Sequence, residues 1–513
     1  MINLQIWHYL GYLIGLFVAL EPSYIHPDEH FQSLGILWPR IMGKQRALPW
    51  EFSPSNSARS YVPLYLTYGP LLYLNKFVFH LESPTTIMYL MRLQNYIMFT
   101  LVTKLSLQFL LKSKIERSKA DFFISTSYII WCYQSHTFSN SIETLILLVV
   151  LSLFNVLIQD SRDIKCKHYK TSFILGSTIA IGVFNRITFP AFIILPSIPT
   201  FHTFFLHNIK AFIIFCGAFI LTCGACIYFD TLAYESTEWC IAPLNNLLYN
   251  LDSSNLAEHG LHPRYTHILV NLPQMLGPSL IFFLSRKKHI TLPFLSCISG
   301  IFILSLFKHQ ELRFLVPLMP LLAMSIELPN FDRYINSNHV MRLWLCFNII
   351  MGMIMGCFHQ RGVITALDHL NQEDAHMGVH IWWKTYSPPS WMYTAENLTS
   401  STTNFVNDEE RLDNVKFTAL KNHEVDLKGC NDGLLKKAIT TFFDSGAKNL
   451  TLIIPKSLHS RVIHVSEDIN TELTEIWSTP FSLDFDHYDF EDLKTLTPGM
   501  TIFNIQKKDV DSQ

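Results

Sequence analysis

The sequence predicts a mainly α-helical, polytopic membrane protein with a small mixed α/β domain at its C-terminal end. The chain has 513 residues, of which 49% are hydrophobic and only 16% are charged, whereas ordinary soluble domains have about 25% charged residues. Long apolar runs recur through most of the chain, and charged residues become frequent only after about residue 361. A water-soluble fold of this size would have too little polar surface.

About eleven segments are apolar over the roughly 20 residues that a membrane helix needs. The first is interpreted as a retained span and not as a signal peptide, because it has no basic N-terminal region and no small-residue cleavage site. The segments lie at about residues 2–20, 88–111, 121–136, 141–158, 171–185, 189–207, 210–230, 265–285, 290–307, 313–328 and 342–360.

The basic loops predict the orientation, because Lys and Arg accumulate on the cytoplasmic side of membrane proteins. With these spans, the opposite, lumenal face receives the loops 21–87 and 231–264 and everything after residue 361. The glycosylation acceptors Asn397 and Asn449 lie in that last region, in agreement with this orientation. The basic clusters on the cytoplasmic side are Lys112 to Lys119, Arg162 to Lys170 and Arg286 to Lys288.

The C-terminal region reads as a separate domain. Leu450 to Pro455 is a short apolar run ended by proline, which is typical of a buried strand. Asp432 to Asp444 has the pattern of a helix. We therefore divide the chain into a multi-span membrane domain at 1–361, with lumenal loops, and a lumenal mixed α/β domain at 362–513.

An acidic motif, His26-Pro27-Asp28-Glu29, is the best candidate for chemistry. Pro27 suits the first position of a helix, and Asp28 and Glu29 suit the positive end of its dipole, so a plain helix start is one interpretation. A carboxylate at the membrane surface could also act as a general base toward a hydroxyl of a lipid-borne substrate. His26 and His30 are four residues apart, but no third ligand is evident, so no metal is expected.

The apolar positions that follow this motif recur at helical spacing. They predict an amphipathic helix that lies on the lumenal membrane face. They are Phe31, Leu34, Leu37, Trp38 and Ile41.

A second motif, Lys308 to Phe314, lies between two apolar runs. His309 and Arg313 are spaced by one helical turn and could point together at an anion, and the planar arginine fork suits a phosphate. The alternative interpretation is a loop with a Glu311–Arg313 or a Lys308–Glu311 ion pair, its long side chains reaching toward water.

Weaker signals lie elsewhere on the predicted lumenal side. His262 and Arg264 could contact phosphate or sugar, although Arg264 would also suit a membrane anchor. Polar islands at Asn140 and Glu143 and at Asn185-Arg186 would face the same cavity. The aromatic cluster His380 to Trp391 is interpreted as an interfacial belt, with sugar stacking as the alternative.

The two motifs resemble those of the endoplasmic-reticulum mannosyltransferases that use dolichyl-phosphate mannose. These enzymes carry an HPDE-type motif in the first lumenal loop and an HQELRF- or HKEERF-type motif between late spans. Here the residues are His26 to Glu29 and His309 to Phe314. The resemblance extends through Gln134 to Glu143, His259 to His267 and Met377 to Pro389, and it is closest to fungal members that act on precursors of the GPI anchor.

The resemblance implies a GT-C fold and transfer of a fourth mannose, in α-1,2 linkage, to the third mannose of a GPI precursor in the endoplasmic reticulum lumen. Because the donor is β-linked and the product α-linked, one inverting displacement suffices. Asp28 would deprotonate the acceptor hydroxyl, and Glu29 would orient the acceptor or substitute as base. Phosphate is already a good leaving group, so no cofactor is expected. The predicted donor-phosphate residues are His309, Gln310, Arg313 and Arg264, and the further pocket residues are His26, His30, Glu311, His262, Asn140 and Glu143.

Alternatives remain at this point. A sibling enzyme would add the third GPI mannose or a lumenal mannose of the N-glycan precursor. From another class, a transporter or flippase would favour discontinuous helices and symmetric repeats. The net charge of −2 and the absence of a basic stripe argue against a nucleic-acid partner.

Overall fold

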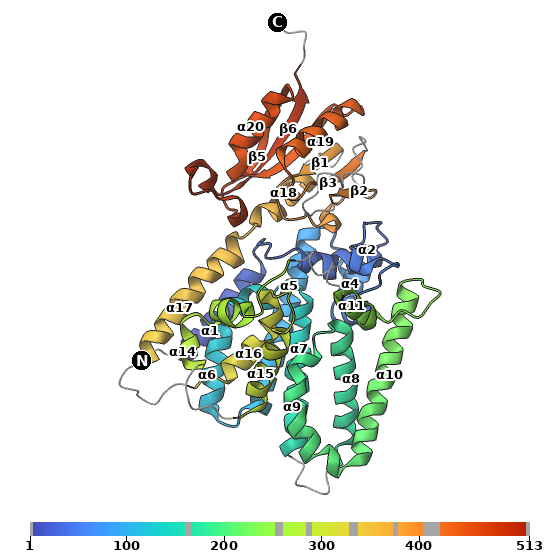
Figure 1. Cartoon of the computed structure of the whole chain (residues 1–513), viewed down its shortest axis with the longest axis vertical. Helices are drawn as coiled ribbons and strands as arrows, with labels where there is room; N and C mark the ends of the chain where they lie inside the picture. The colour runs from blue at the N-terminus through green and yellow to red at the C-terminus, as the bar shows by residue number, and fades with distance from the viewer. Residues whose placement is uncertain are drawn as a thin grey trace. The chain divides into compact units, whose positions relative to one another are not determined.

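The structure is a computed structural model that describes residues 4–159, 167–251, 260–283, 290–327, 337–372, 378–403 and 421–508 (Figure 1). The chain forms two compact units. The helical unit comprises Met1–Leu20, Pro49–Leu71 and Leu90–Gly352, and the mixed unit comprises Glu21–Leu48, Leu72–Tyr89 and Met353–Gln513. The acidic motif therefore folds with the C-terminal part of the chain.

The described secondary structure of the helical unit is helical, and each of the predicted spans overlaps helical residues. The longer elements are α1 (Leu4–Ala19), α5 (Pro84–Leu110), α6 (Lys114–Ser125), α7 (Ser139–Gln159), α8 (Tyr169–Asn185), α9 (Pro190–Thr203), α10 (Ile209–Ala233), α11 (Ala242–Leu251), α15 (Leu292–Leu304) and α17 (Ser337–Met353). Shorter pieces are α3 (Val62–Thr67), η4 (Ile130–Gln134), η7 (His267–Asn271), α13 (Leu272–Leu276), α14 (Leu280–Phe283), η9 (Leu312–Leu318) and α16 (Met319–Met324).

Three helices of the described residues are long and apolar enough to cross a membrane: Ser139–Gln159, Ile209–Ala233 and Asn338–Phe358. Other predicted spans are shorter apolar helices, among them Gln5–Ala19 and Leu292–Leu304. The number of spans therefore stays a prediction. The basic residues 162, 165 and 286–288 lie outside the described residues.

Small residues bring helices of this unit close together, as is usual within membranes. A Cβ atom at Gly176 of α8 would lie 2.3 Å from the Phe215 carbonyl oxygen of α10. Ser296 and Ser299 of α15 donate hydrogen bonds to backbone carbonyls of α9, at 2.7 and 2.6 Å. These contacts leave larger apolar side chains to face outward, as at Ile220 of α10, which is 69% exposed.

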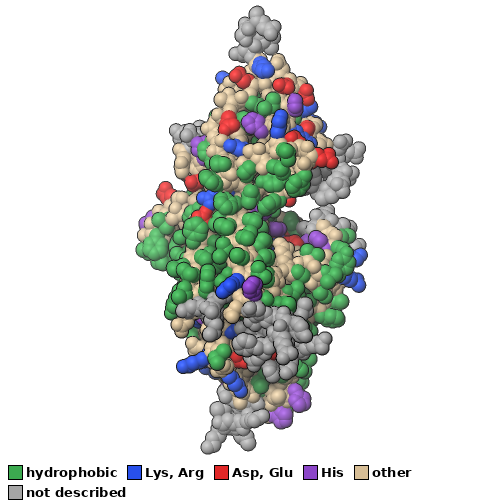
Figure 2. All heavy atoms as spheres, turned by 90° about the vertical axis from the view of Figure 1, so that its left-hand side faces the viewer, with side chains coloured by type: hydrophobic (Ala, Val, Ile, Leu, Met, Phe, Trp, Pro, Cys, Tyr) green, Lys and Arg blue, Asp and Glu red, His purple; other side chains and the backbone are tan. Residues whose placement is uncertain are grey.

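The surface composition differs between the helices and the sheet. Figure 2 shows hydrophobic side chains dominating the visible face of the helices, whereas charged side chains are frequent around the sheet. An apolar exterior of this extent is typical of a surface in contact with lipid.

The mixed unit contains a six-stranded sheet with the order β2-β3-β1-β4-β6-β5. The strands β2, β3, β1 and β4 are parallel, and β6 is antiparallel to both β4 and β5. Their bounds are β1 (Gly378–Trp382), β2 (Thr399–Thr402), β3 (Asn422–Asp426), β4 (Asn449–Pro455), β5 (Thr471–Thr479) and β6 (Met500–Lys507). The predicted mixed α/β character is confirmed, and β4 contains the predicted strand.

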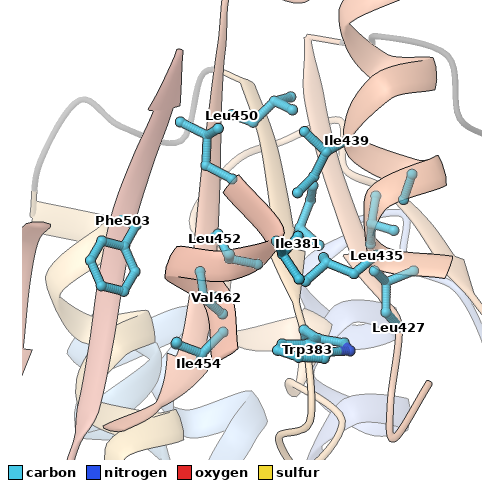
Figure 3. Close-up of a cluster of buried hydrophobic side chains, with 14 of the residues drawn as sticks. Ile381, Trp383, Leu427, Leu435, Ile439, Leu450, Leu452, Ile454, Val462 and Phe503 are labelled. Carbon is cyan, nitrogen blue, oxygen red and sulfur yellow. The ribbon is translucent and has the colours of Figure 1, made fainter. Parts of the chain in front are cut away.

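One face of the sheet is covered by α19 (Asp432–Asp444) and α20 (His459–Asp468), and α19 has the predicted bounds. Asn431 caps α19 by accepting the Leu434 N–H at 2.9 Å. Alternate residues of β1 and β4, such as Ile381 and Leu452, point into this core with Ile439 of α19 (Figure 3). The residues drawn together there are fully or almost fully buried.

The predicted aromatic belt is wrong. Trp382, Trp383 and Trp391 are at most 2% exposed, so they do not lie at a membrane surface. Because strand residues alternate between faces, Trp383 joins the core under α19 and α20. On the other face, Trp382 donates its indole N–H to the Tyr393 hydroxyl at 2.9 Å. That face is covered by chain from residues 384–396 and by α18 (Arg361–Gln372).

The predicted lumenal loop 21–87 also contains helices. They are η1 (His30–Leu34), α2 (Gly35–Met42), η2 (Trp50–Phe52), α3, α4 (Gly69–Leu74) and η3 (Asn75–Phe79). The helix α2 ends at Gly43, whose backbone is left-handed with φ 75°. Each of these helices is shorter than a membrane span.

Candidate functional site

The acidic motif forms a helix start, as predicted. His26 acts as the cap, because its Nδ1 accepts the Asp28 backbone N–H at 3.2 Å and its carbonyl accepts the Glu29 N–H at 3.1 Å. Pro27 occupies the first turn, where a missing N–H costs nothing. The chain then continues through the π-helix η1 into α2. The side chains of the motif therefore stand on a short, well-anchored turn.

Asp28 and Glu29 differ sharply in their surroundings. The Asp28 side chain is 21% exposed, and its Oδ2 accepts a hydrogen bond from Gln32 Nε2 at 2.6 Å. Its Oδ1 lies 3.7 Å from His26 Nδ1. The Glu29 side chain is fully buried, with its Oε2 3.9 Å from His30 Nε2. Of the two carboxylates, only Asp28 is thus open to a molecule arriving from outside the unit.

The apolar face of the following helix is not free to rest on a membrane. Leu34, Leu37, Trp38 and Ile41 are at most 4% exposed. The Trp38 ring packs against Trp391, with 5.7 Å between ring centroids. The predicted helix is confirmed, but the prediction that its apolar side faces lipid is wrong, because the C-terminal part of the chain covers it.

The second motif is not helical where His309 and Arg313 were expected to share a helical turn. Residues 309–311 are not helical, Glu311 has extended backbone angles, and η9 begins only at Leu312. The Glu311 carboxylate joins the two cations instead: Oε1 lies 2.7 Å from His309 Nε2, and both carboxylate oxygens accept from Arg313, one of them from Nη2 at 3.0 Å. The predicted Glu311–Arg313 pair is therefore present.

The surroundings of His309 favour its protonated, cationic form. Its Nδ1 faces the Gly260 carbonyl oxygen at 3.0 Å and its Nε2 faces Glu311, so both ring nitrogens need a hydrogen. Burial by itself lowers the pKa of His309, but the Glu311 carboxylate and the Gly260 carbonyl outweigh it and raise the pKa. Two cations around one carboxylate leave a net positive charge, which suits a phosphate ligand.

Gln310 braces this loop. Its side-chain amide donates to the carbonyls of Arg264, Ser305 and Phe307 at 2.9–3.2 Å, and its oxygen accepts the His267 backbone N–H at 2.8 Å. The residue is 1% exposed. With both amide hydrogens used by the backbone, the geometry does not support direct phosphate binding by Gln310.

The remaining loop residues are arranged around this brace. His262 accepts the Gln310 backbone N–H through Nδ1 at 3.4 Å, and its ring lies 6.0 Å from that of His309. The Arg264 residue is exposed, so its guanidinium can reach a ligand. Sequence reasoning missed His267, which is fully buried and hydrogen-bonded to Asn271 at 2.9 Å. An isolated histidine within an apolar run was the only available signal.

A buried polar cluster forms at the ends of α7 and α8. Arg186 Nε lies 3.3 Å from the Glu143 Oε2, and Asn140 donates to the same oxygen at 3.5 Å. The Arg186 guanidinium also stacks over the Phe314 ring, 5.3 Å from its centroid. Phe314 follows Arg313 directly, so this cluster and the second motif are neighbours. The Arg186–Glu143 pair is buried, and a buried ion pair needs hydrogen-bonding partners of this kind to persist.

The predicted site residues therefore fall into two groups. The mixed unit holds the acidic motif and its two histidines, and the helical unit holds the second motif with the polar cluster. Within the described residues, no three His, Cys, Asp or Glu side chains gather as metal ligands would. Asn397 and Asn449 are both exposed, so a glycan could be attached without unfolding.

Comparison with known proteins identifies the family of this chain. The model of the Alg9-like mannosyltransferase family matches residues 6–395. The chain belongs to the Alg9-like mannosyltransferase family. Its match includes both motifs and the segment around Trp391, and it makes the chain a glycosyltransferase of membranes.

Two members of the Alg9-like family show how far the similarity extends. GPI mannosyltransferase 4 of Eremothecium gossypii is 45% identical over 503 residues, covering 98% of this chain and all of the relative. GPI mannosyltransferase 4 of Saccharomyces cerevisiae is 44% identical, covering 99% of this chain and all of the relative. Similarity at this level runs through the sheet as well as the helices.

The fold is that of GT-C glycosyltransferases. The crystal structure of ArnT from Cupriavidus metallidurans, bound to undecaprenyl phosphate, superimposes with a TM-score of 0.54 and covers 97% of both chains. Sequence identity is only 7%, so this likeness concerns the fold alone. The predicted fold class, a helical membrane glycosyltransferase with a small C-terminal sheet, is confirmed.

Proposed function

We propose that this protein transfers the fourth mannose from dolichyl-phosphate mannose, in α-1,2 linkage, to the third mannose of a GPI precursor, on the lumenal side of the endoplasmic reticulum membrane. Support comes from relatives named GPI mannosyltransferase 4 that match nearly the whole chain. The HPDE and HQELRF motifs support the donor class by resemblance. No nucleotide or metal is needed in this proposal, because the leaving group is a phosphate.

Asp28 is the proposed general base, and the observation that carries this assignment is exposure. A base must come within hydrogen-bond reach of the hydroxyl that it deprotonates. Asp28 is 21% exposed, whereas Glu29 is fully buried behind it. The Gln32 amide donates to one Asp28 oxygen and so fixes the orientation of the carboxylate. The acceptor sugar would approach this carboxylate. Glu29 is thus proposed to support the motif and not to take the proton.

The second motif is proposed to hold the donor phosphate. Arg313 is cationic, the cationic form of His309 is favoured, and the Glu311 carboxylate between them sets their spacing. An incoming phosphate would be attracted by the net positive charge of this cluster, which would also stabilise the negative charge that grows as the sugar leaves. The exposed Arg264 would add a third cation. Gln310 would act indirectly, by holding the loop.

The reaction is proposed to be a single displacement. Asp28 takes the proton of the acceptor hydroxyl as the oxygen attacks the anomeric carbon, and the bond to phosphate breaks on the opposite side. Because dolichyl phosphate leaves as an anion, it needs no second carboxyl group as an acid, unlike the leaving group of a glycosidase.

Lipid analysis of cells depleted of this protein tests the proposal. Accumulation of a GPI precursor with three mannoses, cleared by the wild-type gene but not by Asp28→Asn, is the expected result. Accumulation with two mannoses, or of a truncated N-glycan precursor, would assign the chain to a sibling reaction. If Asp28→Asn also clears the three-mannose precursor, the result would favour a transporter or a structural subunit.

A further inference from the structure

A tryptophan from the C-terminal part of the chain contacts the acidic motif directly. Trp391 lies in the short helix η12 (Ser390–Met392), and its indole Nε1–H donates to His30 Nδ1 at 3.2 Å. Trp391 is 1% exposed and His30 is fully buried. An indole nitrogen can only donate, so His30 Nδ1 must be the acceptor and the neutral ring carries its hydrogen on Nε2.

The other ring nitrogen of His30 lies near the buried Glu29 carboxylate, beyond hydrogen-bond distance. His30 Nε2 lies 3.9 Å from Glu29 Oε2, and neither side chain is exposed. The edge of Tyr24 packs on the His30 ring at 5.0 Å between centroids, and the Tyr24 hydroxyl donates to the Ser387 carbonyl at 2.8 Å. The imidazole thus contacts Trp391 of the C-terminal segment on one side and Tyr24, which is hydrogen-bonded to that segment, on another.

The segment that carries Trp391 is itself firmly anchored. Arg46 donates to the carbonyls of Ser390, Tyr393 and Ala395 at 2.6–3.1 Å. Asn371 of α18 donates to the Met392 carbonyl at 2.8 Å and accepts the Thr394 N–H at 3.1 Å. These bonds leave the indole little freedom to turn away from His30.

Gly35 leaves room for both the π-helix and the indole. A Cβ atom at Gly35 would lie 2.6 Å from the His30 carbonyl oxygen of its own segment and 3.3 Å from Trp391 Cδ1. A side chain there would clash with the π-helix and press on the indole.

We propose that Trp391 is a positioning residue for the acidic motif: its indole N–H fixes the His30 tautomer that faces Glu29, and so holds the turn on which Asp28 stands. The inference rests on the proposed function, because it takes Asp28 as the base. It gives the segment after β1 a part in catalysis, since that segment supplies the indole.

The test compares Trp391→Phe with Trp383→Phe in the full-length protein reconstituted in liposomes. Both changes remove one indole N–H from an equally buried ring, and Trp383 donates to the Cys430 carbonyl at 2.9 Å on the other face of the sheet. One neutral hydrogen bond corresponds to about a three- to tenfold effect. Trp391→Phe should lower kcat by about that factor with KM for donor and acceptor within about twofold, and Trp383→Phe should leave kcat unchanged.

A double-mutant cycle with His30→Ala decides whether Trp391 acts through His30. Trp391→Phe should cause no further loss in the His30→Ala background. Equal kcat losses from both tryptophan variants, or additive losses in the cycle, would overturn the inference. If Trp391→Phe does not fold, Arg46→Lys takes its place, because it loosens the segment from outside and should lower kcat in the same direction.

Failure of the inference and failure of the proposed function give different results. Wild-type protein that does not mannosylate the three-mannose precursor would defeat the proposed function. Wild-type protein that does so, with Trp391→Phe behaving like Trp383→Phe, would defeat only the positioning role.

Discussion

Replacing Asp28 by Asn removes the proposed base with little structural change. Asparagine has the same shape and keeps an oxygen that can accept the Gln32 hydrogen bond. Because Asp28 is 21% exposed and is not part of the core, the expected change in the free energy of unfolding is within about 0.5 kcal/mol. The variant thus separates chemistry from folding.

The expected effect on the rate is large. A positioned general base contributes about 10²- to 10⁴-fold, which at about 1.36 kcal/mol per tenfold corresponds to about 2.7–5.4 kcal/mol of transition-state stabilisation. The loss should appear in kcat, because the introduced side-chain amide can still hydrogen-bond the acceptor hydroxyl in the ground state. Glu29→Gln, by contrast, changes a fully buried group and should lower the stability as well as the rate.

The assay is mannose transfer from dolichyl-phosphate mannose to a three-mannose GPI precursor, with purified variants in liposomes. Thermal unfolding of each variant serves as the folding control. A folded Asp28→Asn protein that keeps more than about a tenth of the wild-type kcat would refute the base assignment. A folded Glu29→Gln protein with the larger loss would transfer that role to Glu29.

Three further predictions concern stability and donor binding. Burial raises the pKa of Glu424 from 4.5 to about 8, so between these pH values the folded state keeps a proton that the unfolded chain releases. The free energy of unfolding therefore falls as pH rises through this window. In Glu424→Gln, the midpoint temperature of thermal unfolding should fall less between pH 5 and 8 than in the wild-type protein. Phe442→Ala empties a fully buried core position and should cost about 3–5 kcal/mol, whereas Phe490→Ala, at a residue 83% exposed, should leave thermal unfolding unchanged. Arg313→Ala should raise the donor KM about tenfold, because it removes one charge-assisted hydrogen-bonding partner of phosphate. Lys308→Ala, at an exposed residue nearby, should leave the donor KM unchanged. Equal donor KM values for the two variants would contradict the phosphate assignment.

The sequence by itself determined the parts of this protein that depend on neighbouring residues. The apolar spans, the helix at Asp432–Asp444 and the strand ending at Pro455 follow from periodicity and length, because backbone geometry repeats over a few residues. The helix start at Pro27 follows from the same local chemistry. The motifs with their residue order were sufficient for the family resemblance.

Only the tertiary structure decided which of two adjacent carboxylates is accessible. Asp28 and Glu29 have similar side chains, and their burial depends on what packs over the turn. The partner of His30 is Trp391, 361 residues away, and periodicity carries no information about contacts at that separation. The same tryptophan was expected in a membrane belt because an apolar ring with one N–H suits either an interface or a core. What decided between them was the segment that folds over the acidic motif, anchored by Arg46.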